Sequence, residues 1–364
     1  MKVLALDHIE FYVADAPAAA RSLRSSCGFR VYGHGGPETG LAGQRSVLLG
    51  QGEIRLLLTS GLHEAHPASQ FVARHGDGVA VIAIRTASAA AAYADVTGAG
   101  GTGICAPRAW ENGQARVVTA EVAGFADVRY RLVERDDGNA HFQPGVIEME
   151  PGAGAGSGHD LLRRIDHAAV CVPAGELDAT VRFHEKVFGL AVTFQEYIEV
   201  GGQGMNSKVV QSPSGGLTLT LIEPDTGRAP GQIDDFLAWH DGAGIQHVAY
   251  LTEDIVAAVR ALAGRGVEFA VTPTGYYDIL GGRLGLTDIA VEELRPLGIL
   301  VDRDHWGQMF QIFLKSTHIR RTYFTELIDR RGARTFGTSN IPALYAAKER
   351  ELAEIRGTVG TSRA

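Results

Sequence analysis

The chain has 364 residues, of which 45% are hydrophobic and 21% are charged, so it has the composition of a globular protein and the length of two domains of roughly 150–180 residues each. Its net charge of −8 gives no electrostatic basis for binding nucleic acid or an anionic membrane, and no apolar run approaches the roughly 20 residues of a membrane span. The three cysteines are scattered without a CxxC spacing, which argues against a disulfide framework and favours a reducing cytoplasm.

Three segments of the first half predict strands, and two of these strands lead into helices. Residues 5–29 (ALDHIEFYVADAPAAARSLRSSCGF) predict an apolar strand that carries Asp7 and His8, followed by a turn and an alanine-rich helix. The charges within the first apolar run favour a strand over a signal peptide. Residues 76–100 (GDGVAVIAIRTASAAAAYADVTGAG) repeat this order and end in glycine, which favours a left-handed helix end. Residues 127–135 (DVRYRLVER) predict a further strand.

The same order of elements follows the small, polar segment PGAGAGSGHD, which is the best candidate for a linker. RIDHAAVCVPAGELDATVRFHEKVFGL parallels the first segment, GAGIQHVAYLTEDIVAAVRALAGRG the second and, more weakly, TYFTELIDR the third. Such a repeat indicates a duplicated module, so we predict an α+β fold of two related halves, each with paired βαβββ modules. The predicted divisions are an N-terminal domain (1–150), a linker (151–160), a C-terminal domain (161–350) and a tail (351–364). The segment NIPALYAAKERELAEI near the C-terminus predicts an amphipathic helix.

Three residues of the second half have the types of metal ligands, and each is expected on a different strand. They are His167, His247 and Glu326. The matching positions of the first half hold His8, Val81 and Arg131. Two imidazoles and one carboxylate leave up to three positions of an octahedral ion open, which suits Fe(II), although Mn(II) and Zn(II) accept the same donors. We therefore expect a metal site only in the C-terminal half and interpret His8 as a vestige of duplication or a structural histidine.

Each of these residues alone has a more ordinary interpretation. A lone histidine in an apolar strand is usually a packed core residue, and a lone glutamate is often a surface charge at a strand edge. The repeat favours a metal site, because the other half has valine and arginine at two of the three positions. The cluster of Asp302, Asp304 and His305 is more typical of an aspartate-rich turn than of a second metal site. We expect surface or capping roles for four other histidines, which are His159, His184, His240 and His318.

Several segments resemble the 4-hydroxyphenylpyruvate dioxygenase family, which has the vicinal-oxygen-chelate fold in both halves. They are GAGIQHVAYLTEDI, YYDILGGR, MFQIFLKS, the segment around Glu326 and FGTSNIPALYAAKERE. The likeness covers nearly the whole chain. It implies an Fe(II) dioxygenase that takes 4-hydroxyphenylpyruvate and O₂ without separate 2-oxoglutarate, with His167, His247 and Glu326 as catalytic metal ligands. The residues that match the family's substrate pocket are Ser207, Gln311, Phe313 and Phe336. An aromatic wall with a few polar groups is what a flat phenol needs.

Two segments depart from the homogentisate-forming members of this family. Where those enzymes carry Pro-x-Asn-Glu-Pro, this chain has Thr220 and Ile222, which face the same side of a strand. Where they carry Gly-Asn-Phe, this chain ends the motif with Ile341, so one aromatic wall of the pocket is lost. The segments TLTLIEPD, PGQID and FGTSNI resemble a sister branch that hydroxylates the benzylic carbon to give 4-hydroxymandelate, a precursor of hydroxyphenylglycine in peptide antibiotics. We therefore expect Thr220 and Ile341 to contact the substrate.

Three alternatives remain open. The chain could be the homogentisate-forming enzyme of tyrosine breakdown, a non-catalytic ligand-binding protein of the same fold, or another metalloenzyme such as an extradiol dioxygenase, a lyase or an isomerase. The intact triad argues against the second alternative, and the segments around Gln311 and FGTSN argue against the third. We expect a homo-oligomer, with no nucleic-acid or membrane partner.

Overall fold

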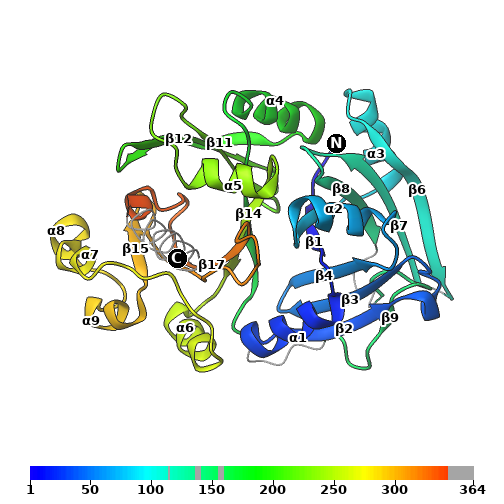
Figure 1. Cartoon of the computed structure of the whole chain (residues 1–364), viewed down its shortest axis with the longest axis horizontal. Helices are drawn as coiled ribbons and strands as arrows, with labels where there is room; N and C mark the ends of the chain where they lie inside the picture. The colour runs from blue at the N-terminus through cyan, green and yellow to red at the C-terminus, as the bar shows by residue number, and fades with distance from the viewer. Residues whose placement is uncertain (114, 136–140, 155–159, 343–364) are drawn as a thin grey trace, which may run out of the picture.

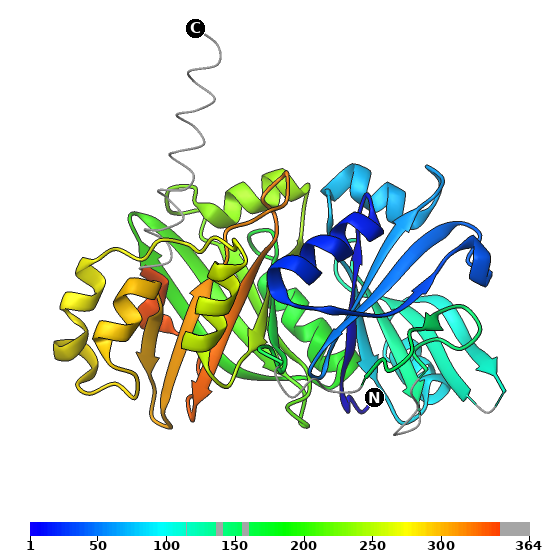
Figure 2. The same ribbon diagram turned by 90° about the horizontal axis from the view of Figure 1, so that it is seen from below.

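Two curved β-sheets lie side by side, one from each half of the chain (Figures 1 and 2). The structure is a computed structural model that describes residues 1–113, 115–135, 141–154 and 160–342. Most of the expected C-terminal helix, the tail, part of the linker and His159 lie outside these ranges. Within them, no helix is both long and apolar enough to cross a membrane. All three cysteines are free thiols.

The first sheet has nine strands in the order β6-β7-β8-β5-β1-β4-β3-β2-β9. These strands are β1 (Ala5–Tyr12), β2 (Arg30–Gly35), β3 (Gln44–Gln51), β4 (Ile54–Gly61), β5 (Gly78–Arg85), β6 (Gly103–Asn112), β7 (Ala115–Ala123), β8 (Arg129–Arg135) and β9 (Glu148–Met149). The helices between them are α1 (Ala16–Cys27), η1 (Pro37–Thr39), α2 (Pro67–His75) and α3 (Ala89–Gly98).

The second sheet has eight strands in the order β11-β12-β13-β10-β14-β17-β16-β15. These strands are β10 (Arg164–Cys171), β11 (Ala191–Val200), β12 (Gln203–Gln211), β13 (Thr218–Pro224), β14 (Gly244–Leu251), β15 (Leu300–Arg303), β16 (Gln308–Phe313) and β17 (Phe324–Arg331). The helices are α4 (Leu177–Phe188), α5 (Gln232–His240), α6 (Ile255–Gly264), α7 (Gly275–Asp278), α8 (Leu280–Leu284), α9 (Val291–Leu294), η2 (Arg295–Leu297) and η3 (Thr338–Asn340).

The two halves share the pairing of their central strands. Strand β1 runs parallel to β4 and antiparallel to β5, and β10 has the same relation to β13 and β14. In both halves a register shift immediately precedes the histidine of the central strand, between Leu6 and His8 and between Ile165 and His167. The predicted α+β architecture of two related halves is therefore confirmed, and the halves also share this irregularity, which the sequence analysis did not predict.

The helices after the central strands begin and end at residues that suit these positions. Asp15, Ser88 and Asp254 precede α1, α3 and α6, and each side chain accepts a hydrogen bond from a backbone N–H of the first turn. Gly28 and Gly189 follow α1 and α4 with φ angles of 79° and 67°, a left-handed conformation that glycine adopts without steric cost. The chain therefore leaves both helices at equivalent points and enters the next strand in the same way.

One hydrophobic core spans both halves, and two histidines expected at the surface are buried. His184 on α4 is fully buried, and its Nε2 accepts a hydrogen bond from the Tyr130 hydroxyl of the first half at 2.6 Å. His240 on α5 is 5% exposed and stacks on the ring of His75 at 4.4 Å. The prediction of surface or capping roles is wrong for His184 and His240, because α4 and α5 pack against the first half.

Candidate metal centre

The three expected ligand residues lie on neighbouring strands of the second sheet. His167 is on β10, His247 on β14 and Glu326 on β17. The Nε2 atoms of the two histidines lie 3.4 and 3.5 Å from the same Glu326 oxygen, and the three ligand atoms lie within 4.8 Å of one another. All three side chains are buried, so the sheet fixes their geometry. Across the described residues, this is the one such cluster of three metal-ligand side chains.

The electrostatics of this cluster favour a bound cation. Burial acts to raise the pKa of Glu326, but hydrogen bonds with His167 and His247 outweigh it and lower the pKa to about 2. Burial acts to lower the pKa of His167, but contacts with Asp166 and Glu326 outweigh it and raise the pKa to about 9. A buried, ionised glutamate requires positive charge beside it. A proton on His167 can supply that charge, and a divalent metal ion bound to the neutral imidazole would take the place of the proton. Two imidazoles and one carboxylate fit Fe(II) and leave positions for further ligands.

A buried ion pair between Asp166 and Arg330 holds His167 on the side of its ring away from Glu326. The Nδ1 atom of His167 lies 2.9 Å from Asp166 and donates, because an ionised carboxylate only accepts, and Nε2 is thereby directed at Glu326. Arg330 on β17 donates to both oxygens of Asp166, each at 2.8 Å. Sequence analysis missed Asp166 and Arg330 as site residues. The available signal was the Asp-His pair in both halves, with an arginine 195 residues apart at Arg135 and Arg330.

The expected polar contacts of the substrate lie on the same sheet face as the triad. Thr220 pairs with Ala169, which lies two residues after His167. Ser207 pairs with Ile222, which lies two residues after Thr220. Gln311 stands two positions before the partner of Glu326. Alternate residues and cross-strand partners share a face, so these side chains face the triad's side. The Thr220 hydroxyl and the Gln311 carbonyl oxygen are buried without a hydrogen-bond partner among the described residues, which leaves both available to a ligand.

Aromatic side chains surround the triad. Phe336 meets the ring of His167 edge-on at 5.1 Å, and Phe313 meets the ring of His247 edge-on at 6.3 Å. Phe324 stacks on His247 at 4.8 Å with an interplanar angle of 23°. Sequence analysis did not single out Phe324, because an apolar strand residue gives no sign of such a contact until the sheet register is known.

Ile341 covers another part of the same face. It is half-buried and packs against a cluster that includes Ala169 and Ile222. The preceding residue, Asn340, is fully buried, and its side-chain oxygen accepts a hydrogen bond from the Tyr276 hydroxyl at 2.6 Å. This turn is therefore anchored to the body of the second half, and Ile341 is held over the sheet.

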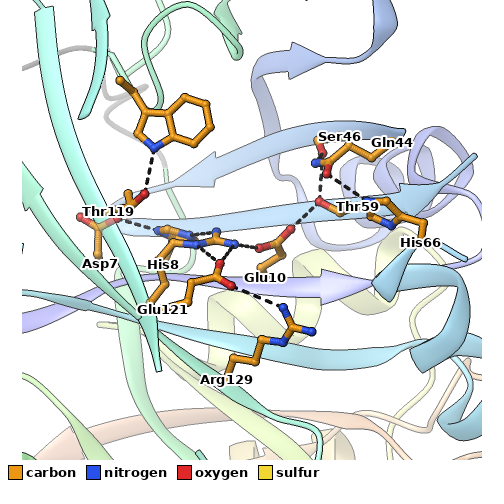
Figure 3. Close-up of polar contacts among 12 residues, drawn as sticks. Asp7, His8, Glu10, Gln44, Ser46, Thr59, His66, Thr119, Glu121 and Arg129 are labelled. Carbon is orange, nitrogen blue, oxygen red and sulfur yellow. Dashed lines mark hydrogen bonds and ion pairs between the residues drawn. The ribbon is translucent and has the colours of Figure 1, made fainter. Parts of the chain in front are cut away.

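In the first half, an arginine stands at the position of the triad glutamate. Val81 and Arg131 occupy the register positions of the second triad histidine and of the glutamate. The Arg131 guanidinium lies 3.3 Å from His8 Nε2, 2.7 Å from Glu10 and 2.8 Å from Glu121. Figure 3 shows these three partners within one polar network. The chain's own cation occupies the place of a metal ion. The expectation that the metal site belongs to the C-terminal half is confirmed, and His8 is a structural histidine.

The aspartate-rich turn before β16 is also structural. Asp304 accepts hydrogen bonds from the backbone N–H groups of Trp306, Gly307, Arg334 and Thr335. Burial acts to raise the pKa of Asp304, but these hydrogen bonds lower it to about 2. Asp304 thus ties two loops together, and it does not form a metal cluster with Asp302 and His305 within the described part of the chain.

Known proteins share both the sequence and the fold. A family model of the Glyoxalase/Bleomycin resistance protein/Dioxygenase superfamily matches residues 164–288. The 4-hydroxyphenylpyruvate dioxygenase of Aspergillus fumigatus is 32% identical over 97% of this chain and 93% of its own, and that of Yarrowia lipolytica is 29% identical over 96% and 92%. The solved structure of a triple mutant of 4-hydroxymandelate synthase from Streptomyces coelicolor is 41% identical and has a TM-score of 0.89, with 96% of this chain and 99% of that chain covered.

These similarities extend over both halves and include the half that carries the triad. A fusion of a xylose isomerase-like TIM barrel with a 4-hydroxyphenylpyruvate dioxygenase shares the fold at a TM-score of 0.73 and 24% identity, over 95% of this chain and 52% of that chain. The alignment covers nearly all of this chain and of the curated relatives, and the triad is suited to Fe(II). Together these findings assign the chain to a family. The chain belongs to the 4-hydroxyphenylpyruvate dioxygenase family of non-haem iron dioxygenases, within the vicinal-oxygen-chelate superfamily.

Proposed function

We propose that this protein is a 4-hydroxymandelate synthase, which converts 4-hydroxyphenylpyruvate and O₂ to 4-hydroxymandelate and CO₂. The observation that carries the proposal is the 41% identity to the 4-hydroxymandelate synthase structure, against 32% and 29% to two curated 4-hydroxyphenylpyruvate dioxygenases. The departures at Thr220, Ile222 and Ile341 favour the same assignment. The reaction is balanced, because both atoms of O₂ are incorporated, one in the new benzylic hydroxyl group and one in the carboxylate left after CO₂ is lost.

In this proposal His167, His247 and Glu326 hold one Fe(II). The iron would bind the α-keto acid end of the substrate and activate O₂, which explains why no separate 2-oxoglutarate is needed. Each of the three residues supplies one ligand group, and the residues lie on adjacent strands. Because the sheet is rigid, the remaining positions of the ion would stay open on one side. The division into a metal-free domain (1–150), a linker (151–160), a catalytic domain (161–350) and a tail (351–364) is part of the same proposal.

The other residues of the face would position the substrate. Phe313 and Phe336 flank the triad and would enclose the phenol ring while excluding water. The unpaired oxygens of Thr220 and Gln311 would meet the substrate's polar groups, and Ser207 on the neighbouring strand would add a further polar contact. These groups bind and orient a small aromatic acid, which is why we assign the site to a small-molecule substrate.

The test is product analysis after anaerobic loading of the protein with Fe(II), followed by 4-hydroxyphenylpyruvate and O₂. Homogentisate and 4-hydroxymandelate are isomers, so chromatography against both standards is needed in addition to mass. Homogentisate as the main product would make the protein the enzyme of tyrosine breakdown. Ligand binding without O₂ consumption would make it a non-catalytic binding protein.

A further inference from the structure

Arg330 of the second half contacts two groups beside the triad. These are Asp166, which holds His167, and Phe336, which forms an aromatic wall of the pocket. Arg330 lies four residues after Glu326 on β17, and its side chain is 14% exposed. Two of its nitrogens donate to Asp166, each at 2.8 Å, in a forked arrangement that a lysine cannot reproduce. Asp166 accepts from Nδ1 of His167 at 2.9 Å. Arg330 therefore fixes the carboxylate that fixes the histidine.

The remaining nitrogen of Arg330 holds the loop that carries Phe336. It donates to the carbonyl oxygens of Thr335 at 2.7 Å and Ala333 at 3.3 Å. The guanidinium lies 4.9 Å from the centre of the Phe336 ring, within the range of a cation–π contact. Phe336 in turn lies edge-on to His167 at 5.1 Å. The contacts form a closed circuit that runs from His167 through Asp166 and Arg330 to Phe336 and back.

We propose that Arg330 is a positioning residue that couples the metal-ligand geometry of His167 to the seating of Phe336 against the substrate ring. A shift of the Arg330 guanidinium moves both His167 and Phe336, because this guanidinium is hydrogen-bonded to Asp166, which holds His167, and is packed against the Phe336 ring. Metal affinity and substrate binding are therefore linked through Arg330. This inference rests on the proposed function, since it takes the triad as the metal site and Phe336 as a pocket wall.

The first half contains the same circuit beside a position that holds no metal triad. Arg135 donates to Asp7 at 2.8 and 3.0 Å, and Asp7 lies 2.6 Å from Nδ1 of His8. The Arg135 guanidinium lies 5.2 Å from the ring of Phe142, which meets His8 at 4.6 Å. Nε2 of His8 faces the Arg131 guanidinium, whereas Nε2 of His167 faces a carboxylate. The structural contribution of the circuit is common to both halves, and its effect on a metal can arise only in the second.

The duplication supplies a matched control for the experiment. Arg330→Gln and Arg135→Gln remove the same fork from equivalent places in the full-length chain. We expect both variants to lose thermal stability to a similar extent. In anaerobic Co(II) titrations followed by visible absorption, we expect Arg330→Gln to weaken metal binding by about 10–100-fold and Arg135→Gln by less than about twofold. Arg330→Lys keeps the charge without the fork, and should fall between wild type and Arg330→Gln.

The link to Phe336 is measured in a double-variant cycle on the KM for 4-hydroxyphenylpyruvate, with the metal saturating. We expect Arg330→Lys and Phe336→Leu to raise KM each, and the double variant to raise it by less than the product of the two effects. Metal affinity unchanged in Arg330→Gln and Arg330→Lys, or an equal loss in Arg135→Gln, overturns the positioning role. Strictly multiplicative effects on KM overturn the coupling. His247→Ala tests the proposed function separately. If this variant binds Co(II) as tightly as the wild-type chain, the triad is not the metal site and the proposed function is overturned.

Discussion

Arg131 and Glu326 occupy the same place in the two halves of the molecule with opposite charge. Arg131 pairs with Ala83 on β5, as Glu326 pairs with Ala249 on β14, and both lie beside the histidine of the central strand. In the first half the cation at this point belongs to the chain. In the second half the buried carboxylate faces two histidines, and a metal ion bound by all three would supply the balancing charge. The exchange of arginine for glutamate, together with valine for histidine at the position of His247, thus separates a self-neutralised polar core from a metal site.

This relationship predicts one metal ion per chain. Changing His167, His247 or Glu326 to Ala should abolish most metal binding and all activity, because each removes one of three ligands. His8→Ala should keep one metal ion per chain, because His8 contacts Arg131 and not an ion. Elemental analysis of the folded, Fe(II)-loaded variants checks both statements. A loss of iron from His8→Ala with an intact fold would contradict the division of roles between the halves.

The same relationship predicts that Arg131 is essential for the stability of the first half. Arg131→Met leaves Glu10 buried without its cation and leaves Glu121 only the longer contact with Arg129, and should lower the free energy of unfolding by roughly 3–5 kcal/mol. Arg129 is a matched control, because it is 29% exposed and reaches Glu121 at only 3.5 Å. Arg129→Met should cost less than about 1 kcal/mol. Urea unfolding measures both, and equal losses would show that the buried network does not depend on Arg131.

Acid should weaken the interface between the halves through His184. Its Nδ1 donates to the Thr180 carbonyl oxygen and its Nε2 accepts from Tyr130, so the packed form is neutral. Burial lowers the pKa of His184 to about 4, and the hydrogen bond to Thr180 offsets this only in part. Protonation therefore favours the unfolded chain. The stability contributed by neutral His184 is fully present above pH 6.5 and is lost as the pH falls toward 4, up to about 3 kcal/mol.

His184→Gln tests this pH dependence, because glutamine stays neutral and still offers an acceptor to Tyr130. The variant should be less stable than wild type at pH 7.5 and should approach or exceed it at pH 4.5. Urea unfolding at the two pH values gives the comparison. Equal differences between variant and wild type at both values would contradict the role assigned to His184.

The fold and the triad could be predicted because both follow from local pattern and internal repetition. The Asp-His strands mark equivalent points in the two halves, and overlaying them isolates His247 and Glu326 against Val81 and Arg131. The burial of His184 could not be predicted, because it depends on which face of α4 meets the other half. The stacking of Phe324 on His247 likewise depends on sheet register, which a single strand does not encode.

Substrate oxidation should be coupled to its own decarboxylation. The triad would leave positions for one bidentate α-keto acid, and Thr220 and Gln311 offer unpaired oxygens for a single aromatic acid. We expect one CO₂ released per O₂ consumed with 4-hydroxyphenylpyruvate alone. An oxygen electrode with parallel CO₂ measurement gives the ratio. An absolute requirement for added 2-oxoglutarate would place the chemistry in a different class of iron dioxygenase.

The choice of product should depend on the wall that includes Ile341 and Thr220. In the proposed reaction, the ring carbon that bears the side chain and the neighbouring benzylic carbon would compete as targets of oxidation, and the pocket would select between them by distance. A phenylalanine at position 341 would press on the ring face, whereas Ile341, which packs against the cluster that includes Ile222, would not make that flat contact. Thr220 places a rotatable hydroxyl on the same face, where proline would be rigid. The substrate ring would then be free to turn its benzylic carbon toward the metal.

A displacement of about 1 Å can change a rate by around a hundredfold, so small changes of this wall are sufficient to redirect the reaction. We expect Ile341→Phe, alone or with Thr220→Pro, to divert part of the turnover from 4-hydroxymandelate to ring-oxidised products that include homogentisate. Metal content should be unchanged, because neither residue is a ligand, and this separates a change of selectivity from a damaged site. Chromatography of the products against both standards measures the ratio. Because Ile341 and Thr220 would act on ring orientation and not on O₂ activation, the fold-change in total O₂ consumption should be much smaller than the fold-change in the ratio of the two products. A fall in turnover with an unchanged product ratio would assign the selectivity to other residues.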